Sequence, residues 1–201
     1  MSRRIVLNVG GGNKTIPLPP HYAGWEHLLL DVVAREDVDL VCDARDLTAF
    51  PGDAYDAIYC SHNLEHYHRH EVQQVLAGFH HVLSADGFCE IRVPDLRSVM
   101  QAVLEKNLSL EAELYRSPAG PISPLDVIYG YHREIETGNP FYAHKTGFTS
   151  ETLTACLQAA GFTELWTAPP LGVHEVRILA FKQASGPQQR GMLGIPSQEP
   201  R

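Results

Sequence analysis

The sequence predicts an α/β protein with a doubly wound, mostly parallel sheet of seven strands in a three-layer α/β/α arrangement. The first five strand-like runs are apolar rather than alternating, which is typical of parallel strands that are covered on both faces. Helical periods fall between several of these runs, and the connections are short. Such an alternation of strands and helices indicates an α/β sheet.

Seven segments have the composition of strands. The first stops at three consecutive glycines, and the second and third each run into an aspartate. In chain order the segments are residues 3–8, 27–32, 40–44, 55–61, 87–95, 163–168 and 175–182.

Apolar residues at helical spacing predict helices over residues 72–83, 95–115 and 153–160. The third has the clearest boundary signals. Thr149 or Ser150 is suited to be its N-cap, and Gly161 follows directly after its end.

We expect one domain over residues 1–183, with an insertion at about residues 117–147. The insertion mixes aromatic residues and histidines with turn residues, and long insertions in compact domains are commonly lids or binding loops. Three prolines in residues 15–24 occupy the place where the first crossover helix is expected. The composition of residues 184–201, rich in Gly, Pro, Gln and Ser, predicts a disordered tail.

The overall composition is that of a globular protein, with 44% hydrophobic and 20% charged residues and no long apolar run. The formal net charge of −8 argues against a non-specific binder of nucleic acid or of anionic membranes, because such proteins need a basic face. The four cysteines form no C-x-x-C pair and sit in apolar stretches, so we expect free thiols in a reducing cytoplasm.

The segment NVGGGNKT (residues 8–15), after the first strand, matches neither of two common nucleotide-binding motifs. The fingerprint G-x-G-x-x-G would need glycine in place of Thr15, and a P-loop would need glycine in place of Asn13. What remains is Gly10-x-Gly12 at the carboxyl end of a strand. Glycines there let the backbone approach a ligand closely, at the edge where doubly wound sheets bind ligands.

Two aspartates follow at equivalent places. Asp31 ends the second strand, where a carboxylate can accept hydrogen bonds from both ribose hydroxyls of a nucleoside. Asp43 ends the third strand and could accept a hydrogen bond from an adenine amino group. Together with the glycines, the two aspartates favour a nucleoside site over unrelated turn residues.

In this order the segments resemble the class I S-adenosylmethionine (SAM)-dependent methyltransferases, of the small type 11-like group. The matching segments are LNVGGG (7–12), LLLDV (28–32), VCDARDL (41–47), YDAIYCSHNLEH (55–66), HHVLSADGFCEIRVPD (80–95) and FTSETLTACLQAAGF (148–162). The resemblance implies the Rossmann-like methyltransferase fold and SAM as the cofactor. It also implies a cofactor site formed by Asn8, Gly10, Gly11, Gly12, Asp31, Val32, Asp43, Ala44, Ser61 and His62.

Two positions depart from the family pattern. Asn8 stands where the family usually has an acid that helps to hold the methionine part of the cofactor, and Lys14 stands where glycine is usual. An amide can still form hydrogen bonds but carries no negative charge towards the sulfonium. A catalytically degenerate module that binds the cofactor, with a regulatory role, is therefore the alternative.

The stretch SHNLEHYHRH (residues 61–70) offers a second, remote alternative. His62, Glu65 and His66 have the H-x-x-E-H spacing of one class of zinc protease. That function requires both histidines within one helix, whereas a strand leads directly into them and the helical period starts only at Val72. We therefore expect the end of a strand at the cofactor-binding edge and no metal site.

Methyl transfer from a sulfonium is a direct displacement, so much of the catalysis consists of positioning the acceptor and excluding water. A hydroxyl acceptor also needs a base, and histidine suits this role near neutral pH. The candidates are His62, close to the cofactor, and His144, from the insertion. The acidic balance favours a small-molecule or sugar-like acceptor, methylated on an O or N atom, over a nucleic acid.

Overall fold

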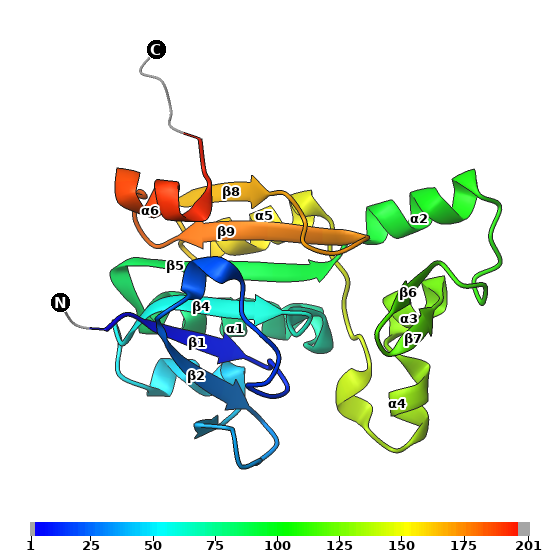
Figure 1. Ribbon diagram of the computed structural model, residues 1–201, viewed down its shortest axis with the longest axis horizontal. Helices are drawn as coiled ribbons and strands as arrows, with labels where there is room; N and C mark the ends of the chain where they lie inside the picture. Colours follow the sequence, from blue (N-terminus) through cyan, green and yellow to red (C-terminus); the bar gives the residue numbers. More distant parts are fainter. Residues whose placement is uncertain (1–2, 197–201) are drawn as a thin grey trace.

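A computed structural model describes residues 3–196, whose centre is a seven-stranded sheet with the strand order β3-β2-β1-β4-β5-β9-β8. The strands are β1 (Ile5–Val9), β2 (Glu26–Asp31), β3 (Leu40–Val41), β4 (Tyr55–Ser61), β5 (Leu83–Pro94), β8 (Glu164–Ala168) and β9 (Glu175–Phe181). Strands β1 to β5 are mutually parallel, and β9 runs antiparallel to both of its neighbours. The predicted mostly parallel sheet of seven strands is confirmed (Figure 1).

One face of the sheet is covered by helix α1 (Arg69–Val82), helix α5 (Ser150–Ala159) and the 3₁₀ segment η2 (Ala44–Ala49). Helix α1 buries Val75, Leu76 and Phe79 completely, as its helical period predicts. Helix α5 begins after the expected cap, because the Thr149 side chain accepts a hydrogen bond from the Thr152 N–H. It ends before Gly161, whose φ is +99°.

The opposite face is covered differently. The proline-rich stretch contains only the short 3₁₀ segment η1 (Pro20–Tyr22), and Tyr22 packs on Phe88 and Tyr59 of the sheet. Helix α6 (Pro187–Leu193) and Ile195 complete this layer (Figure 1). A helix of ordinary length is thus replaced here by two short segments.

Helix α6 corrects the prediction of a disordered tail for the part of the tail that the structure describes. Pro187 occupies the first turn of α6, and Gly194 ends it in the left-handed conformation with φ +67°. Arg190 pairs with Glu164 of β8, while Met192, Leu193 and Ile195 pack on the apolar face. The prediction was wrong here because Gly, Pro and Gln dominate the composition of the tail and its apolar residues are few. Residues 197–201 lie outside the described residues.

The predicted helix over residues 95–115 is too long. Helix α2 spans only Leu96–Glu105, and Asn107, with φ +47°, turns the chain out of the helical path. The chain then forms the hairpin of β6 (Tyr115–Ser117) and β7 (Gly120–Ile122). Side chains from α2 and this hairpin share a small separate core that includes Val99, Ala102 and Ile122.

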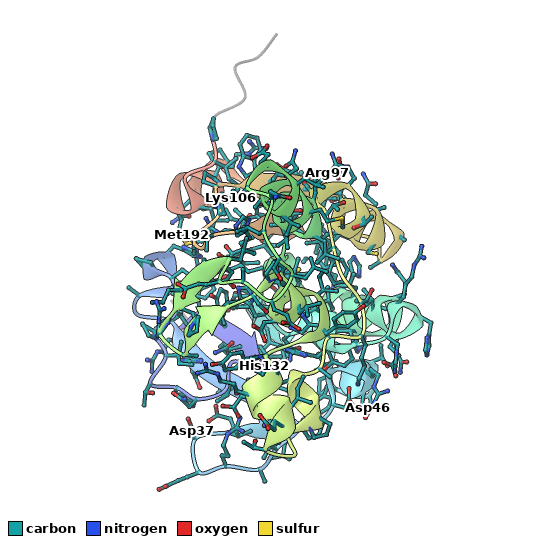
Figure 2. All side chains as sticks on the ribbon, turned by 90° about the vertical axis from the view of Figure 1, so that its right-hand side faces the viewer. Asp37, Asp46, Arg97, Lys106, His132 and Met192 are labelled. Carbon is teal, nitrogen blue, oxygen red and sulfur yellow. The ribbon has the colours of Figure 1, made fainter. Side chains whose placement is uncertain are left out.

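The insertion continues with helix α3 (Pro124–Tyr129), helix α4 (His132–Glu136) and the 3₁₀ segment η4 (Pro140–Tyr142). It lies beyond the carboxyl ends of the parallel strands, at the right of Figure 1. Figure 2 views the molecule from that side, with His132 of α4 towards the reader. No helix within residues 3–196 is both long enough and apolar enough to cross a membrane.

Candidate functional site

A cleft of about 480 Å³ lies at the carboxyl ends of β1, β2 and β4. Phe141 and Tyr142 of η4, with the neighbouring Lys145, line its side towards the insertion. Of the predicted cofactor-binding residues, those that line the cleft are Asn8, Gly10, Gly11, Gly12, Asp31, Val32, Asp43, Ser61 and His62. Ala44 is the exception, because it is fully buried at the start of η2 and does not reach the cleft wall.

The glycine loop after β1 requires its glycines for steric reasons. Gly10 has φ +67° and donates a backbone hydrogen bond of 2.8 Å to the carbonyl oxygen of Leu30. A Cβ atom on Gly10 would lie 2.0 Å from Nδ2 of Asn63, and one on Gly11 would lie 2.1 Å from Nδ2 of Asn8. The backbone is thus pressed against two asparagine side chains, with no room for a side chain of its own.

These two asparagines have unsatisfied acceptors. Asn8 is 2% exposed, and its Nδ2 lies 3.2 Å from Nε2 of His27. Oδ1 of Asn8 and Oδ1 of Asn63 are buried and have no hydrogen-bond partner within the described part of the chain. Because such atoms are normally paired, the two oxygens indicate a donor that a ligand would supply.

Lys14, the other departure from the family pattern, points away from this cleft. Its ammonium lies 2.6 Å from Asp39, and its backbone N–H donates to Asp37. Lys14 therefore ties the glycine loop to the segment after β2 and does not line the cleft.

Asp31 and Asp43 both line the cleft, and each forms an ion pair with an arginine. Oδ2 of Asp31 lies 2.6 Å from Arg35, and Oδ1 accepts from the N–H of Val33. Asp43 accepts from both the N–H and the guanidinium of Arg45, the latter at 2.7 Å. Burial raises the pKa of Asp43, but these hydrogen bonds outweigh it and the net pKa is lowered.

His62 follows β4 in a left-handed conformation with φ +50° and has a 47% exposed side chain. Nε2 lies 3.2 Å from Glu175, and Nδ1 lies 3.6 Å from Glu65. Burial lowers the pKa of His62, but the two carboxylates outweigh that effect and raise it to about 9. The ring therefore carries a proton at neutral pH.

The sequence analysis missed Arg92, which lines the cleft, and Glu175, which contacts His62 and Arg92. Arg92, on β5, donates to Glu175 through Nη2 at 2.6 Å and to the hydroxyl of Tyr59 through Nη1 at 2.6 Å. Glu175 is the first residue of β9 and also accepts from the N–H of Leu171. A charged residue within an apolar strand was the available signal at both positions, but nothing in the sequence indicated that these strands are neighbours.

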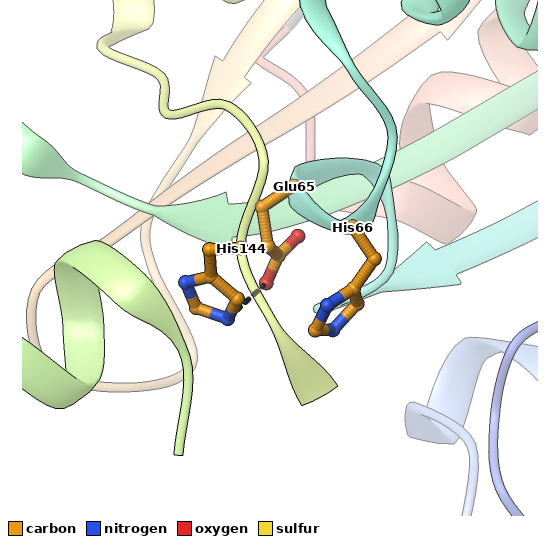
Figure 3. Close-up of side chains that lie close together, drawn as sticks. All are labelled: Glu65, His66 and His144. Carbon is orange, nitrogen blue, oxygen red and sulfur yellow. Dashed lines mark ion pairs between the residues drawn. The ribbon is translucent and has the colours of Figure 1, made fainter. Parts of the chain in front are cut away.

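His144 does not line the cleft. Its ring lies next to that of His66, with the centroids 4.9 Å apart, and Nε2 is 4.0 Å from Oε1 of Glu65 (Figure 3). His144 therefore lies behind His66, which does line the cleft, and its predicted catalytic role stays a prediction.

The H-x-x-E-H spacing does not form a helical metal site. Glu65 and His66 lie in the 3₁₀ segment η3 (Leu64–His66), His62 precedes it, and α1 begins only at Arg69. The prediction that this stretch follows the end of a strand at the cleft edge is confirmed.

Comparison with known proteins agrees with the fold. Residues 26–91, about a third of the chain, match the family model described as a methyltransferase domain. This segment is therefore similar to a methyltransferase domain, and the order of the strands around it agrees with that similarity. A search of curated proteins found no match.

Solved structures with a similar fold have low sequence identity to this chain. The 1,6-didemethyltoxoflavin-N1-methyltransferase of Burkholderia thailandensis, with S-adenosylhomocysteine bound, is 19% identical, with a TM-score of 0.54 over 90% of this chain and 72% of the other. A SAM-dependent methyltransferase of Archaeoglobus fulgidus is 17% identical, with a TM-score of 0.52 over 90% and 86%. Human N-acetylserotonin methyltransferase, in complex with SAM, is 13% identical, with a TM-score of 0.51 over 90% and 48%.

Proposed function

We propose that this protein is a class I SAM-dependent methyltransferase, which transfers the methyl group of SAM to an O or N atom of a small-molecule acceptor. The observation that carries the proposal is that Gly10, Asp31 and Asp43, from three separate strand ends, line one cleft. SAM supplies a methyl group that is already activated on a sulfonium. The protein's own residues therefore need to bind and orient the two reactants and to exclude water.

The polar groups of the cleft suit an adenosine. A carboxylate offers about four acceptor positions, and Arg35 and the N–H of Val33 use two of those of Asp31. The others are available for the ribose hydroxyls. Val32 and Val33 are partly exposed beside Asp31 and offer apolar contacts.

The unsatisfied amide oxygens suit the amino group of a methionine moiety. An ammonium has three donors, and Oδ1 of Asn8 and Oδ1 of Asn63 are two buried acceptors without partners. We therefore assign Asn63 to the cofactor site together with Asn8. In this proposal the amide pair takes over the role of the acid that the family usually has at Asn8.

The acceptor is assigned to the side of the cleft next to the insertion. Phe141 and Tyr142 offer exposed aromatic surface there, and the cleft volume lies within the range of about 300–1,000 Å³ typical of small-molecule sites. Both ring nitrogens of His62 face carboxylates, so neither offers a free lone pair to the acceptor. We assign His62 to positioning the acceptor rather than to removing its proton.

The test is calorimetric binding of SAM and S-adenosylhomocysteine. Asp31→Ala is expected to weaken binding of both at least about tenfold, or roughly 1.4 kcal/mol, because two ribose hydroxyls lose their acceptor. Asp46→Ala is the matched control, since Asp46 is an exposed aspartate close by that does not line the cleft. Unchanged affinity in Asp31→Ala would locate the cofactor elsewhere.

The release of S-adenosylhomocysteine during incubation with a panel of small hydroxyl and amine acceptors tests turnover. Release that depends on an acceptor supports the enzyme. Tight binding of both ligands without release from any acceptor favours the alternative of a binding module.

A further inference from the structure

The strongest unexplained cluster of side chains is formed by Glu65, His66 and His144 (Figure 3). Each residue brings a potential metal-ligand atom, and these atoms all lie within 4.8 Å of one another. Glu65 and His66 come from η3, whereas His144 comes from the end of the insertion. The backbone holds the two segments together, because the N–H groups of Lys145 and Thr146 donate to the carbonyl oxygen of Glu65 at 2.9 and 3.2 Å.

Glu65 carries the second observation that points to a ligand. Its side chain is 1% exposed, and neither carboxylate oxygen has a hydrogen-bond partner among residues 3–196. Nδ1 of His62 lies 3.6 Å and Nε2 of His144 4.0 Å from Oε1 of Glu65, and both separations are longer than a hydrogen bond. The carboxylate thus has charged neighbours but no hydrogen bond, and a metal ion would give its buried oxygens the direct partner that they lack.

In both histidines of the cluster, Nδ1 faces a backbone carbonyl oxygen, which leaves Nε2 available to bind a metal. Nδ1 of His144 lies 2.8 Å from the carbonyl oxygen of Val127, and Nδ1 of His66 lies 3.1 Å from that of Ala143. A carbonyl oxygen only accepts, so Nδ1 carries the hydrogen and Nε2 the lone pair in each neutral ring. This arrangement, with a backbone carbonyl behind the imidazole, is the usual support of metal-bound histidines.

We propose that Glu65, His66 and His144 bind one divalent first-row transition cation, with Zn²⁺ as the best match to two imidazoles and a carboxylate. Such sets leave one or more coordination positions open. Tetrahedral ligands at about 2.1 Å from Zn²⁺ lie about 3.4 Å apart, so separations of up to 4.8 Å must close by up to about 1.4 Å.

The ion would join the insertion to the end of β4. His66 lines the cleft, while Glu65 and His144 lie behind it. This site uses only part of the H-x-x-E-H spacing, because Nε2 of His62 faces Glu175. The proposal differs from the sequence expectation of no metal site.

The test uses untagged, chelator-treated full-length protein and Zn²⁺ alone. Titration calorimetry is expected to show one bound equivalent, and Zn²⁺ is expected to raise the melting temperature. His144→Ala and Glu65→Gln should each weaken Zn²⁺ binding at least about tenfold. His70→Ala is the control, because His70 is an exposed histidine outside the cluster and should bind Zn²⁺ as the native chain does.

Visible absorption of the native protein with Co²⁺ provides a measurement that needs no variant. Intense bands typical of a tetrahedral site are expected with one equivalent. The proposal is overturned by no binding at micromolar Zn²⁺, or by binding that is lost in His70→Ala and kept in the cluster variants. Binding of S-adenosylhomocysteine is measured separately without metal, so failure of one proposal is distinguishable from failure of the other.

Discussion

Gly10→Ala separates the steric requirement of the glycine loop from the cost of its backbone conformation. An alanine at φ +67° costs about 1–2 kcal/mol of stability wherever it occurs. At this position the new Cβ would also lie 2.0 Å from Nδ2 and 2.5 Å from Cγ of Asn63, so the asparagine must move. Overpacking of this kind adds typically about 1–3 kcal/mol, giving an expected total of about 2–5 kcal/mol.

Gly24→Ala is the matched control for this prediction. Gly24 has φ +82°, but a Cβ there would have no neighbour within 4 Å, so only the conformational cost applies. Urea unfolding followed by circular dichroism measures the free energy of unfolding of both variants. Calorimetry with S-adenosylhomocysteine should show at least about a tenfold weaker affinity in Gly10→Ala alone, because Asn63, which lines the cleft, is displaced from its position.

A double variant tests whether the contact with Asn63 causes the additional loss of stability. Asn63→Ala removes the two nearest atoms, Nδ2 and Cγ, and leaves only Cβ at 3.0 Å from the new Cβ. Gly10→Ala combined with Asn63→Ala should therefore destabilise less than the sum of the two single changes. Equal effects of Gly10→Ala and Gly24→Ala on stability and on affinity would refute the steric reasoning. Additive effects in the double variant would do the same.

Two further predictions concern the rest of the molecule. Glu90 is fully buried and pairs with Arg177 at 2.7 Å and with His21 at 2.8 Å. Glu90→Gln should lower the free energy of unfolding, measured in urea, by about 3–5 kcal/mol, because it leaves a buried arginine without its charged partner. Glu151→Gln, in the exposed pair with Arg97, should change this free energy by less than about 1 kcal/mol, and similar losses in both variants would contradict the prediction. Burial raises the pKa of Asp126, but hydrogen bonds from Ser123 and His132 outweigh it and lower the pKa to about 2. Because this folded-state value lies below the unfolded value of about 3.9, the carboxylate stabilises the insertion fully only above about pH 5, and this contribution of about 2–3 kcal/mol is lost as the pH falls from there towards 1. Proteolysis of the insertion should therefore accelerate over that range in the native protein, and an equally steep acceleration in Asp126→Asn would argue against Asp126 as the cause.

Local patterns were sufficient for the sheet. The strands of the parallel core are predominantly apolar, and burial on both faces explains that composition without knowledge of the neighbours. The wrong predictions concern two segments in which contacts with residues distant in the sequence outweigh the local pattern. The helical period after Leu96 ended at Glu105 because the following residues pack as a hairpin against α2, and the tail formed α6 because its few apolar residues cover the sheet.

The amino-acid sequence by itself determined the strand ends that form the cleft, because the glycine loop, Asp31 and Asp43 each follow directly from the strand before them. Tertiary structure alone decided the partners of the histidines. Glu175 reaches His62 from 113 residues away, and His144 meets Glu65 only where the insertion folds back on η3. Such contacts depend on which strands become neighbours in the sheet and on how a long insertion packs against the domain. Local periodicity in the sequence predicts neither of these.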